Sequence, residues 1–229
     1  MAQFHFVEDY QRHVARLVRN YPIDEAMSLA IGGKYEEIGD IASDVVIHAG
    51  ARDGMSIFDF GCGSGRVASA LSRKVRIGRF IGTDVVQELL DYAATKTPDY
   101  FEFKCHRKLS IPADDESLDL IYAFSVFTHL LHEESYIYMR DMHRALKPEG
   151  RLLFSFLEFA KPTHWTQFER AMLARMKGEQ RSLCTFIDRN QLTVWARQLH
   201  FEIVEYIEGD ELRWDRRRLG QSAVILQKT

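Results

Sequence analysis

The stretch Ile57-Phe-Asp-Phe-Gly-Cys-Gly-Ser-Gly65 decides which fold this sequence predicts. It runs from a short apolar strand, residues 55–60, into a helix expected over 66–74. Its three glycines stand at alternate positions, and they let a ligand approach the backbone and reach the helix N-terminus. Asp59 precedes the first glycine by two residues, where a carboxylate repels a pyrophosphate but suits a ligand with positive charge. The stretch therefore predicts a binding loop after the first strand of a sheet.

Helices and strands alternate around this loop from about residue 36 to residue 157. Strands are expected at 55–60, 79–83, 100–103, 118–125 and 151–157, and helices at 36–49, 66–74, 87–96 and 135–146. The strand at 118–125 is apolar on both faces after its second residue, which is typical of a central parallel strand. The alternation predicts an α/β fold with a doubly wound, mostly parallel sheet.

The two ends of the chain depart from this alternation. A helix is expected over 4–19, and residues 160–186 form an insert in which Trp165, Phe168, Met172 and Met176 share one helical stripe. A capping-box pattern at 188–191 opens a further helix. The last two strands, 201–207 and 222–227, are joined by a loop too short for a helical crossover, so we expect an antiparallel pair. We predict one domain over 1–229, with the helices of 1–50 and the 160–186 insert covering the site.

Composition excludes several broad classes of protein. The chain has 229 residues, 30 Lys+Arg against 33 Asp+Glu, a net charge of -3 and 46% hydrophobic residues. These values exclude a disordered chain and argue against a nucleic-acid partner. The sequence contains no apolar run long enough to span a membrane and no signal-peptide pattern, so we expect no membrane partner. Three widely spaced cysteines predict a reduced, cytoplasmic protein without a cysteine-based metal site.

Asp84 ends the second strand, at a position that favours hydrogen bonds to the hydroxyls of a ribose. Dinucleotide-dependent oxidoreductases carry G-x-G-x-x-G in the glycine loop, whereas Arg66 stands here where that pattern requires its third glycine. Together with Asp59, this departure disfavours a dinucleotide, and an oxidoreductase is kept only as an alternative.

Four motifs, in order, resemble the class I S-adenosylmethionine-dependent methyltransferases of the small-molecule type. The motifs are IFDFGCGSGRVASAL, IGTDVV, ESLDLIYAFSVFTHL and LKPEGRLLFSF, within about residues 36–157. The resemblance implies a Rossmann-like, seven-stranded sheet with an antiparallel last strand. It also implies S-adenosyl-L-methionine as cofactor and S-adenosyl-L-homocysteine as product.

The resemblance also implies which residues hold that cofactor. The methionine end belongs to Asp59, Phe60, Gly61, Cys62 and Gly63, the ribose to Asp84, and the adenine to Val85, with Phe124 and Ser125 near the methionine moiety. Lys34 and Tyr35, just before the helix expected over 36–49, are expected to reach the cofactor's carboxylate. Many members carry an acidic residue after the third strand that accepts the adenine amino group. The chain reads Cys105-His-Arg-Lys108 there, so His106 or backbone groups are expected to replace that acid.

Two histidines are candidates for catalysis. His129 follows the fourth strand, where topology places a substrate, and a histidine near pH 7 is suited to remove a proton from an acceptor. His164 begins the insert and is the second candidate, with packing inside a cap helix as the alternative. His129 and His132 are three residues apart, but no third ligand is apparent beyond Glu133 and Glu134, so we predict no metal site.

The predicted function is transfer of a methyl group to an oxygen or nitrogen nucleophile of a small-molecule acceptor. Methylation of a protein or RNA is the alternative within the enzyme class, disfavoured by the balanced charge. A further alternative is a catalytically silent domain that only binds partners, which predicts that side chains occlude the glycine loop. The sequence does not identify the acceptor or the oligomeric state.

Overall fold

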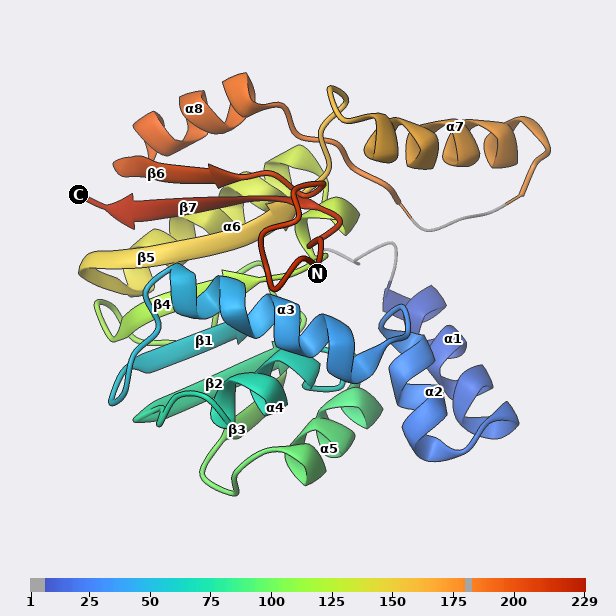
Figure 1. The fold of residues 1–229 in the computed structure, drawn as a ribbon, viewed down its shortest axis with the longest axis horizontal. Coiled ribbons are helices and arrows are strands. Elements are labelled where there is room, and N and C mark those ends of the chain that lie inside the picture. The colour runs from blue at the N-terminus through green and yellow to red at the C-terminus, as the bar shows by residue number, and fades with distance from the viewer. Residues whose placement is uncertain (1–6, 180–182) are drawn as a thin grey trace.

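A seven-stranded sheet forms the centre of the protein (Figure 1). The structure, a computed structural model, describes residues 7–179 and 183–229. The strands are β1 (Ser56–Phe60), β2 (Arg79–Asp84), β3 (Glu102–Cys105), β4 (Leu118–Ala123), β5 (Leu146–Phe156), β6 (Phe201–Ile207) and β7 (Ser222–Lys228). Their spatial order is β3-β2-β1-β4-β5-β7-β6. The first five strands pair in parallel and β7 runs antiparallel to both its neighbours, which confirms the predicted sheet.

Helices cover both faces of this sheet. They are α1 (Val7–Asn20), α2 (Ile23–Ala30), α3 (Tyr35–His48), α4 (Arg66–Ser72), α5 (Gln87–Lys96), α6 (His132–Ala145), α7 (Pro162–Met176) and α8 (Arg189–Gln198), with a short 3-10 turn at Phe127–His129. Helices α3 and α4 bury one face together with Ile57, Phe80 and Leu120. Helices α6 and α8 bury the other face together with Phe58 and Ile121. Strands buried on both faces explain the continuous apolar runs of the sequence.

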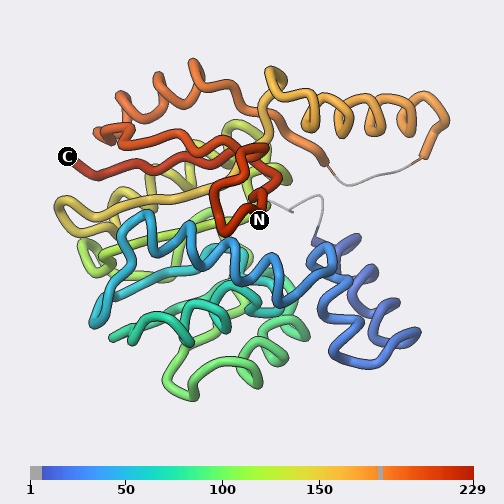
Figure 2. The backbone as a smooth tube through the Cα atoms, viewed as in Figure 1, coloured from blue at the N-terminus to red at the C-terminus, as the bar shows by residue number. Residues whose placement is uncertain are grey.

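A third apolar cluster joins the N-terminal helices to the sheet's carboxyl edge. Val14 and Leu17 of α1 and Met27 of α2 pack against Val86 and Leu89 at the start of α5. Helices α1 and α2 therefore sit over the end of β2, as Figures 1 and 2 show at the right-hand end of the molecule.

The predicted elements match the observed ones in order and type, with several local differences. Strand β5 begins at Leu146, five residues before its predicted start, and α6 begins at His132, three residues before its own. The sequence pattern does not predict helix α2, because Tyr21-Pro22 ends the periodicity, yet Pro22 stands at the N-cap and α2 starts directly after it. Strand β3 lies two residues later than expected. Asp188 is the N-cap of α8 but makes no side-chain cap hydrogen bond, so the capping box is not formed. The beginning of the predicted first helix, residues 4–6, lies outside the described residues.

Helix α7 stands apart from the rest of the fold. It extends sideways beyond the sheet, and only His164 and Ala174 of its fifteen residues are buried. Within the described residues, no helix is both long and apolar enough to cross a membrane.

Candidate functional site

The candidate site lies at the carboxyl ends of β1, β2 and β4, where the order of the strands reverses. Ligands of open α/β sheets bind at such a switch point. The loop after β1 carries Gly61, Gly63 and Gly65, all with positive φ, and leads directly into α4. Because other residues rarely adopt positive φ, this alternate spacing of glycines is required by the path of the backbone.

Neighbouring side chains already contact the glycine loop. A Cβ on Gly61 would lie 2.3 Å from Val126 Cγ2, and a Cβ on Gly63 would lie 2.8 Å from Ile31 Cγ2. The hydroxyl of Ser64 donates to the carbonyl of Met27, and Ser64 is fully buried. The loop is therefore enclosed by the chain between α2 and α3 on one side and by the segment after β4 on the other.

Asp84 connects β2 to the glycine loop. Its Oδ2 accepts from the backbone N–H of Gly63 at 3.0 Å, and its Oδ1 accepts from Val85 and Val86 at 2.7 and 3.0 Å. The side chain is only 8% exposed. Burial raises the pKa of Asp84 to about 6, against the lowering effect of the three backbone hydrogen bonds. Asp84 thus fixes the loop and presents a buried carboxylate beside it.

Asp59 is the second buried carboxylate of the site. It pairs with Tyr122 across the β1–β4 ladder, is 3% exposed, and its Oδ2 has no hydrogen-bond partner among the described residues. Burial raises the pKa of Asp59 to about 8; the adjacent Tyr122 hydroxyl lowers it and Asp84 raises it further. An unpaired buried carboxyl beside another carboxylate suits a ligand that brings positive charge or hydrogen-bond donors.

The raised pKa of Asp59 predicts that the ligand-free protein loses stability as pH rises. A carboxyl that titrates near pH 4 when unfolded and near pH 8 when folded stabilises the protein below the lower value. That contribution declines as pH rises through the folded pKa. As the pH rises from about 6 to about 8, the titration of Asp59 should lower the free energy of unfolding by about 2 kcal/mol.

Urea unfolding of the wild type and of Asp59→Asn measures this decline. Asparagine does not titrate, so the difference in unfolding free energy between the two proteins should shift by that amount across the pH window. The comparison cancels the titration of the histidines, which both proteins share. Parallel curves would show that Asp59 has an ordinary pKa.

Arg66 and Tyr10 belong to the site, although no sequence argument assigns them a role in it. Arg66 opens α4, donates to the carbonyl of Gly33 at 3.3 Å, and is attracted electrostatically to Asp59. Burial lowers the pKa of Arg66. Burial also raises the pKa of the Tyr10 hydroxyl, with Asp84 as a second cause, and that hydroxyl donates to Ala30. The one feature of the sequence that draws attention to Arg66 is its position, where the dinucleotide pattern has its third glycine.

The structure places Tyr35 on the loop itself. Its hydroxyl donates to the backbone carbonyl of Ser64 at 2.9 Å, and burial raises its pKa. Lys34 pairs with Glu37 at the surface. Tyr35 therefore ties α3 to the glycine loop, and the contact of Lys34 and Tyr35 with a ligand carboxylate stays a prediction.

Phe60 and Cys62 contribute through packing. The Phe60 ring lies on the α6 face of the sheet, 4.5 Å from the centroid of Tyr138. Cys62 is buried, its Sγ lies 3.0 Å from the position of a Cβ on Gly82, and burial raises its pKa. Only the backbone of these two residues is available to a ligand at the loop.

The expected adenine side of the site gathers around Val85. The Cys105 thiol and the Arg107 guanidinium both donate to the carbonyl of Val85, the latter at 2.9 Å. His106 is half-buried, pairs with the Ser110 hydroxyl at 3.1 Å, and has its pKa lowered mainly by burial. The backbone N–H of His106 donates to the carbonyl of Asp84, so His106 lies directly beside the end of β2.

Phe124 and Ser125 form the turn after β4. Ser125 has a φ of 58°, and its N–H donates to the Ser155 hydroxyl of β5 at 2.8 Å. A positive φ at a residue other than glycine is strained and is often found at binding sites. The half-buried Phe124 ring lies 6.0 Å from the centroid of Tyr122, on the same side of the sheet as Asp59.

His129 and His164 have different surroundings. His129 Nδ1 lies 2.8 Å from the carbonyl of Leu183, so this nitrogen carries the proton and Nε2 is the basic one. His164 is 1% exposed; its Nδ1 accepts from the Glu158 N–H, and its Nε2 contacts the Gly220 carbonyl. With both ring nitrogens engaged, His164 connects the start of α7 to two loops and has no free nitrogen for proton transfer.

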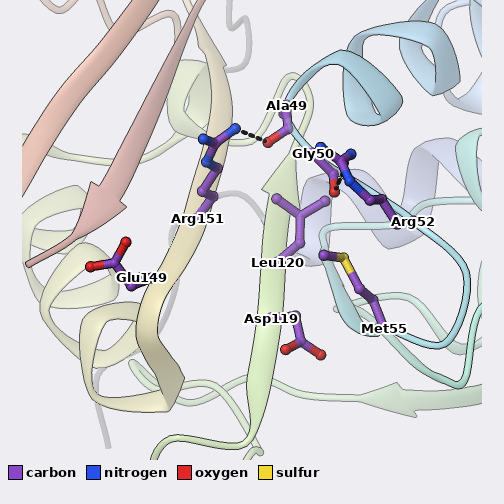
Figure 3. Close-up of a pocket in the computed structure, with 8 residues that line it drawn as sticks. All are labelled: Ala49, Gly50, Arg52, Met55, Asp119, Leu120, Glu149 and Arg151. Atoms are coloured by element: carbon purple, nitrogen blue, oxygen red, sulfur yellow. Dashed lines mark hydrogen bonds between the residues drawn. The ribbon is translucent and has the colours of Figure 1, made fainter.

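Other features of the described residues lie away from this site. No group of three or more potential ligands among the described residues is placed to hold a metal ion. A cavity of about 140 Å³ opens at the opposite, amino-terminal edge of the sheet (Figure 3). It is lined by Ala49, Gly50, Arg52, Met55, Asp119, Leu120, Glu149 and Arg151. None of these belongs to the glycine loop or its neighbours.

Comparison with known proteins gives consistent matches. Residues 58–154 match the family described as a methyltransferase domain. An uncharacterized methyltransferase-like protein of Schizosaccharomyces pombe is 30% identical over 96 residues, 42% of this chain and 36% of that protein. The ubiquinone/menaquinone biosynthesis C-methyltransferase UbiE of Hahella chejuensis is 28% identical over 152 residues, 59% of each. The chain thus spans between about a third and three fifths of the length of these curated relatives.

A solved structure shares the whole fold. Magnesium protoporphyrin IX methyltransferase (ChlM) from Synechocystis PCC 6803, with bound SAH, superposes with a TM-score of 0.67 at 14% identity, over 98% of this chain and 96% of that one. At this identity the likeness concerns the fold alone.

Proposed function

We propose that this chain, which belongs to the class I S-adenosylmethionine-dependent methyltransferases, transfers the methyl group of S-adenosyl-L-methionine to a small-molecule acceptor. The observation that carries the proposal is the pair of buried carboxyls, Asp59 and Asp84, on either side of the glycine loop. The orphaned Asp59 Oδ2 and the raised pKa of both acids fit a ligand that combines positive charge with ribose hydroxyls.

Different residues of the chain would then bind different parts of the cofactor. Asp84 would accept from the ribose hydroxyls while it holds Gly63, and Asp59 would balance the charge of the cofactor's methionine end. Arg66, half-buried at the start of α4 and attracted electrostatically to Asp59, would oppose the cofactor's carboxylate. Helices α1 and α2 would exclude water by enclosing the loop. When bound, the cofactor supplies an activated methyl on its sulfonium, so the protein's main task is to orient the acceptor.

His129 is the proposed general base. The carbonyl of Leu183 fixes the proton on Nδ1, which leaves Nε2 able to accept a proton from a hydroxyl or amine nucleophile. Leu183 belongs to the segment that follows α7, so this hydrogen bond also links the base to the proposed substrate cap, residues 160–186. His164 would instead be a positioning residue, because its hydrogen bonds hold the start of α7 against the loop before β7.

Two matched variants separate a base from a structural histidine. His129→Asn keeps an N–H near the Nδ1 position and loses Nε2; His129→Gln keeps a nitrogen near Nε2 but cannot act as a base. We expect both to lower kcat by about 100-fold or more, with little change in cofactor affinity. Initial rates of methyl transfer from radiolabelled cofactor provide the measurement. Full activity of His129→Asn would assign His129 a purely structural role.

A second candidate is a domain of the same fold that binds partners and no cofactor. Burial of the glycine loop under Ile31 and Val126 is the observation that favours it. The two candidates differ in one respect that is easily measured, since only an enzyme of this class is stabilised by S-adenosyl-L-homocysteine.

The acceptor class follows from charge and from the relatives. A net charge of -3 lowers attraction to nucleic acid and favours a small molecule. The relative UbiE is a C-methyltransferase, so a carbon nucleophile joins oxygen and nitrogen as a candidate. We place the reaction in the cytoplasm because the three cysteines are all free thiols.

A further inference from the structure

One polar residue interrupts the apolar end of β5. The sequence of residues 152–156 is Leu-Leu-Phe-Ser-Phe, and Ser155 is only 1% exposed although it carries a hydroxyl. Because a buried hydroxyl without a partner is costly, a serine is expected in such a run only where its hydroxyl is used. Side chains alternate along a strand, so Ser155 lies with Leu153 on the face of the sheet that α3 and α4 cover. Its partners there indicate its role.

The Ser155 hydroxyl makes two hydrogen bonds. Its oxygen accepts from the backbone N–H of Ser125 at 2.8 Å, and the hydroxyl donates to Oε1 of Gln221 at 2.6 Å. Ser125 is the second residue after β4, and Gln221 directly precedes β7. The hydroxyl therefore joins the turn after β4 to the loop before β7. Since the proton points to Gln221, a lone pair of the oxygen is free to accept from Ser125.

The residue that Ser155 holds has an uncommon backbone conformation. Ser125 has a φ of 58°, in the left-handed region, where a side chain causes strain. Such a conformation persists only where surrounding contacts hold it. Thr128 Oγ1 donates to the Ser125 carbonyl at 3.3 Å from within the same turn, whereas Ser155 holds the N–H from the neighbouring strand. The contact with Ser155 is the shorter one, and it fixes the turn against the sheet.

The turn at Ser125 leads to both parts of the candidate site. The next residue is Val126, whose side chain occupies the space that a Cβ on Gly61 would need. The carbonyl of Val126 accepts from the backbone N–H of His129 at 2.8 Å. The conformation of Ser125 therefore determines how Val126 meets the glycine loop and where the proposed base begins.

We infer that Ser155 is a positioning residue: its hydroxyl, oriented by Gln221, holds Ser125 in the left-handed conformation on which the cofactor loop and His129 depend. Strand β4 lies between β5 and β1, so Ser155 acts through Ser125. The effect on cofactor binding rests on the proposed function, whereas the hold of Ser155 on Ser125 does not.

Calorimetric titration of the full-length protein with S-adenosyl-L-homocysteine tests the inference. Ser155→Ala removes the hydroxyl and should weaken binding about tenfold, because the turn loses the contact that offsets its strain. The matched control is Ser135→Ala, which removes a fully buried hydroxyl of α6 that has no hydrogen-bond partner among the described residues. This control should bind within about twofold of the wild type, and circular dichroism confirms that each variant folds.

The variant Ser125→Gly separates positioning from a merely structural role. Glycine adopts a positive φ without steric strain, so it does not need to be held. In a Ser125→Gly background, the change Ser155→Ala should therefore weaken binding by no more than about threefold. Equal affinity of Ser155→Ala and the wild type would overturn the inference, and so would an equal loss in the two backgrounds.

Nuclear magnetic resonance of the ligand-free protein distinguishes failure of this inference from failure of the proposed function. Backbone chemical shifts report φ, and those of Ser125 should move toward values typical of a negative φ in Ser155→Ala but not in Ser135→Ala. A wild type that does not bind S-adenosyl-L-homocysteine would contradict the proposed function. Moved shifts would then still support the hold of Ser155 on Ser125, and unchanged shifts would overturn it.

Discussion

Replacement of Asp84 by alanine is expected to weaken the binding of S-adenosyl-L-homocysteine by about 100-fold or more, because hydrogen bonds to a charged group contribute about 1.5–3 kcal/mol each. Asp84 is buried at the end of β2 and is the proposed acceptor for the ribose hydroxyls. It also holds the N–H of Gly63, so its loss removes a ligand contact and frees the loop. Isothermal titration calorimetry measures the change.

A matched variant at the opposite edge of the sheet controls for the loss of an acid. Asp119 pairs with Lys147 and accepts from the Ser56 N–H at the start of β1. Asp119→Ala should lower stability and leave affinity within about twofold, since independent sites do not couple. Asp84→Ala that folds and binds as tightly as the wild type would remove Asp84 from the cofactor site.

Replacement of Glu158 by alanine is expected to lower the free energy of unfolding by about 3 kcal/mol, because it removes charge-assisted hydrogen bonds from Arg189 and leaves the buried Ser222 hydroxyl without its partner. Glu158 is 4% exposed. Its two oxygens accept from Arg189 at 2.9 and 3.0 Å, and Oε1 also accepts from the Ser222 hydroxyl. These contacts join the end of β5 to α8 and β7. For a chain of this size the loss corresponds to a fall in Tm of about 6–12 °C.

The neighbouring Glu208 provides the comparison. It pairs with Arg189 and Lys161, but its side chain is partly exposed. Glu208→Ala should therefore cost no more than about 1 kcal/mol. Equal losses in the two variants, measured by calorimetry, would show that burial of Glu158 is not the source of its stabilising effect.

The glycine loop and the strand-end acids are predictable because each depends on local sequence. Few residues other than glycine adopt a positive φ, and an aspartate at the end of an apolar strand stands out in the sequence. The residue types alone therefore indicate where the loop and the acids lie. The mostly parallel sheet follows from the alternation of helices and strands, and its antiparallel end follows from the short last connection. These features of the seven-stranded sheet therefore depend on patterns that lie within short stretches of the chain.

The contacts between distant segments are not predictable in this way. In the sequence pattern, Tyr10 is one more apolar position of the first helix. Only the packing of α1 over β2 brings it near Asp84. His164 is only a candidate for catalysis in the sequence, and folding engages both its ring nitrogens with backbone groups. The stripe of α7 suggests an inward face, whereas in the structure only its first half packs on the chain, where Phe168 contacts Phe159 and Phe186, and Met176 at its end is exposed. Periodicity identifies an apolar face without indicating what covers it.

The measurement that tests the central claim most directly is the melting temperature of the wild-type protein with S-adenosyl-L-homocysteine or with a nicotinamide dinucleotide. We predict that saturating S-adenosyl-L-homocysteine raises Tm by several degrees, since a ligand at about 100 times its Kd adds roughly 2.7 kcal/mol. A nicotinamide dinucleotide at the same concentration should leave Tm unchanged. Stabilisation by the dinucleotide alone, or by neither ligand, would contradict the assignment of Asp59, Asp84 and the glycine loop to S-adenosylmethionine.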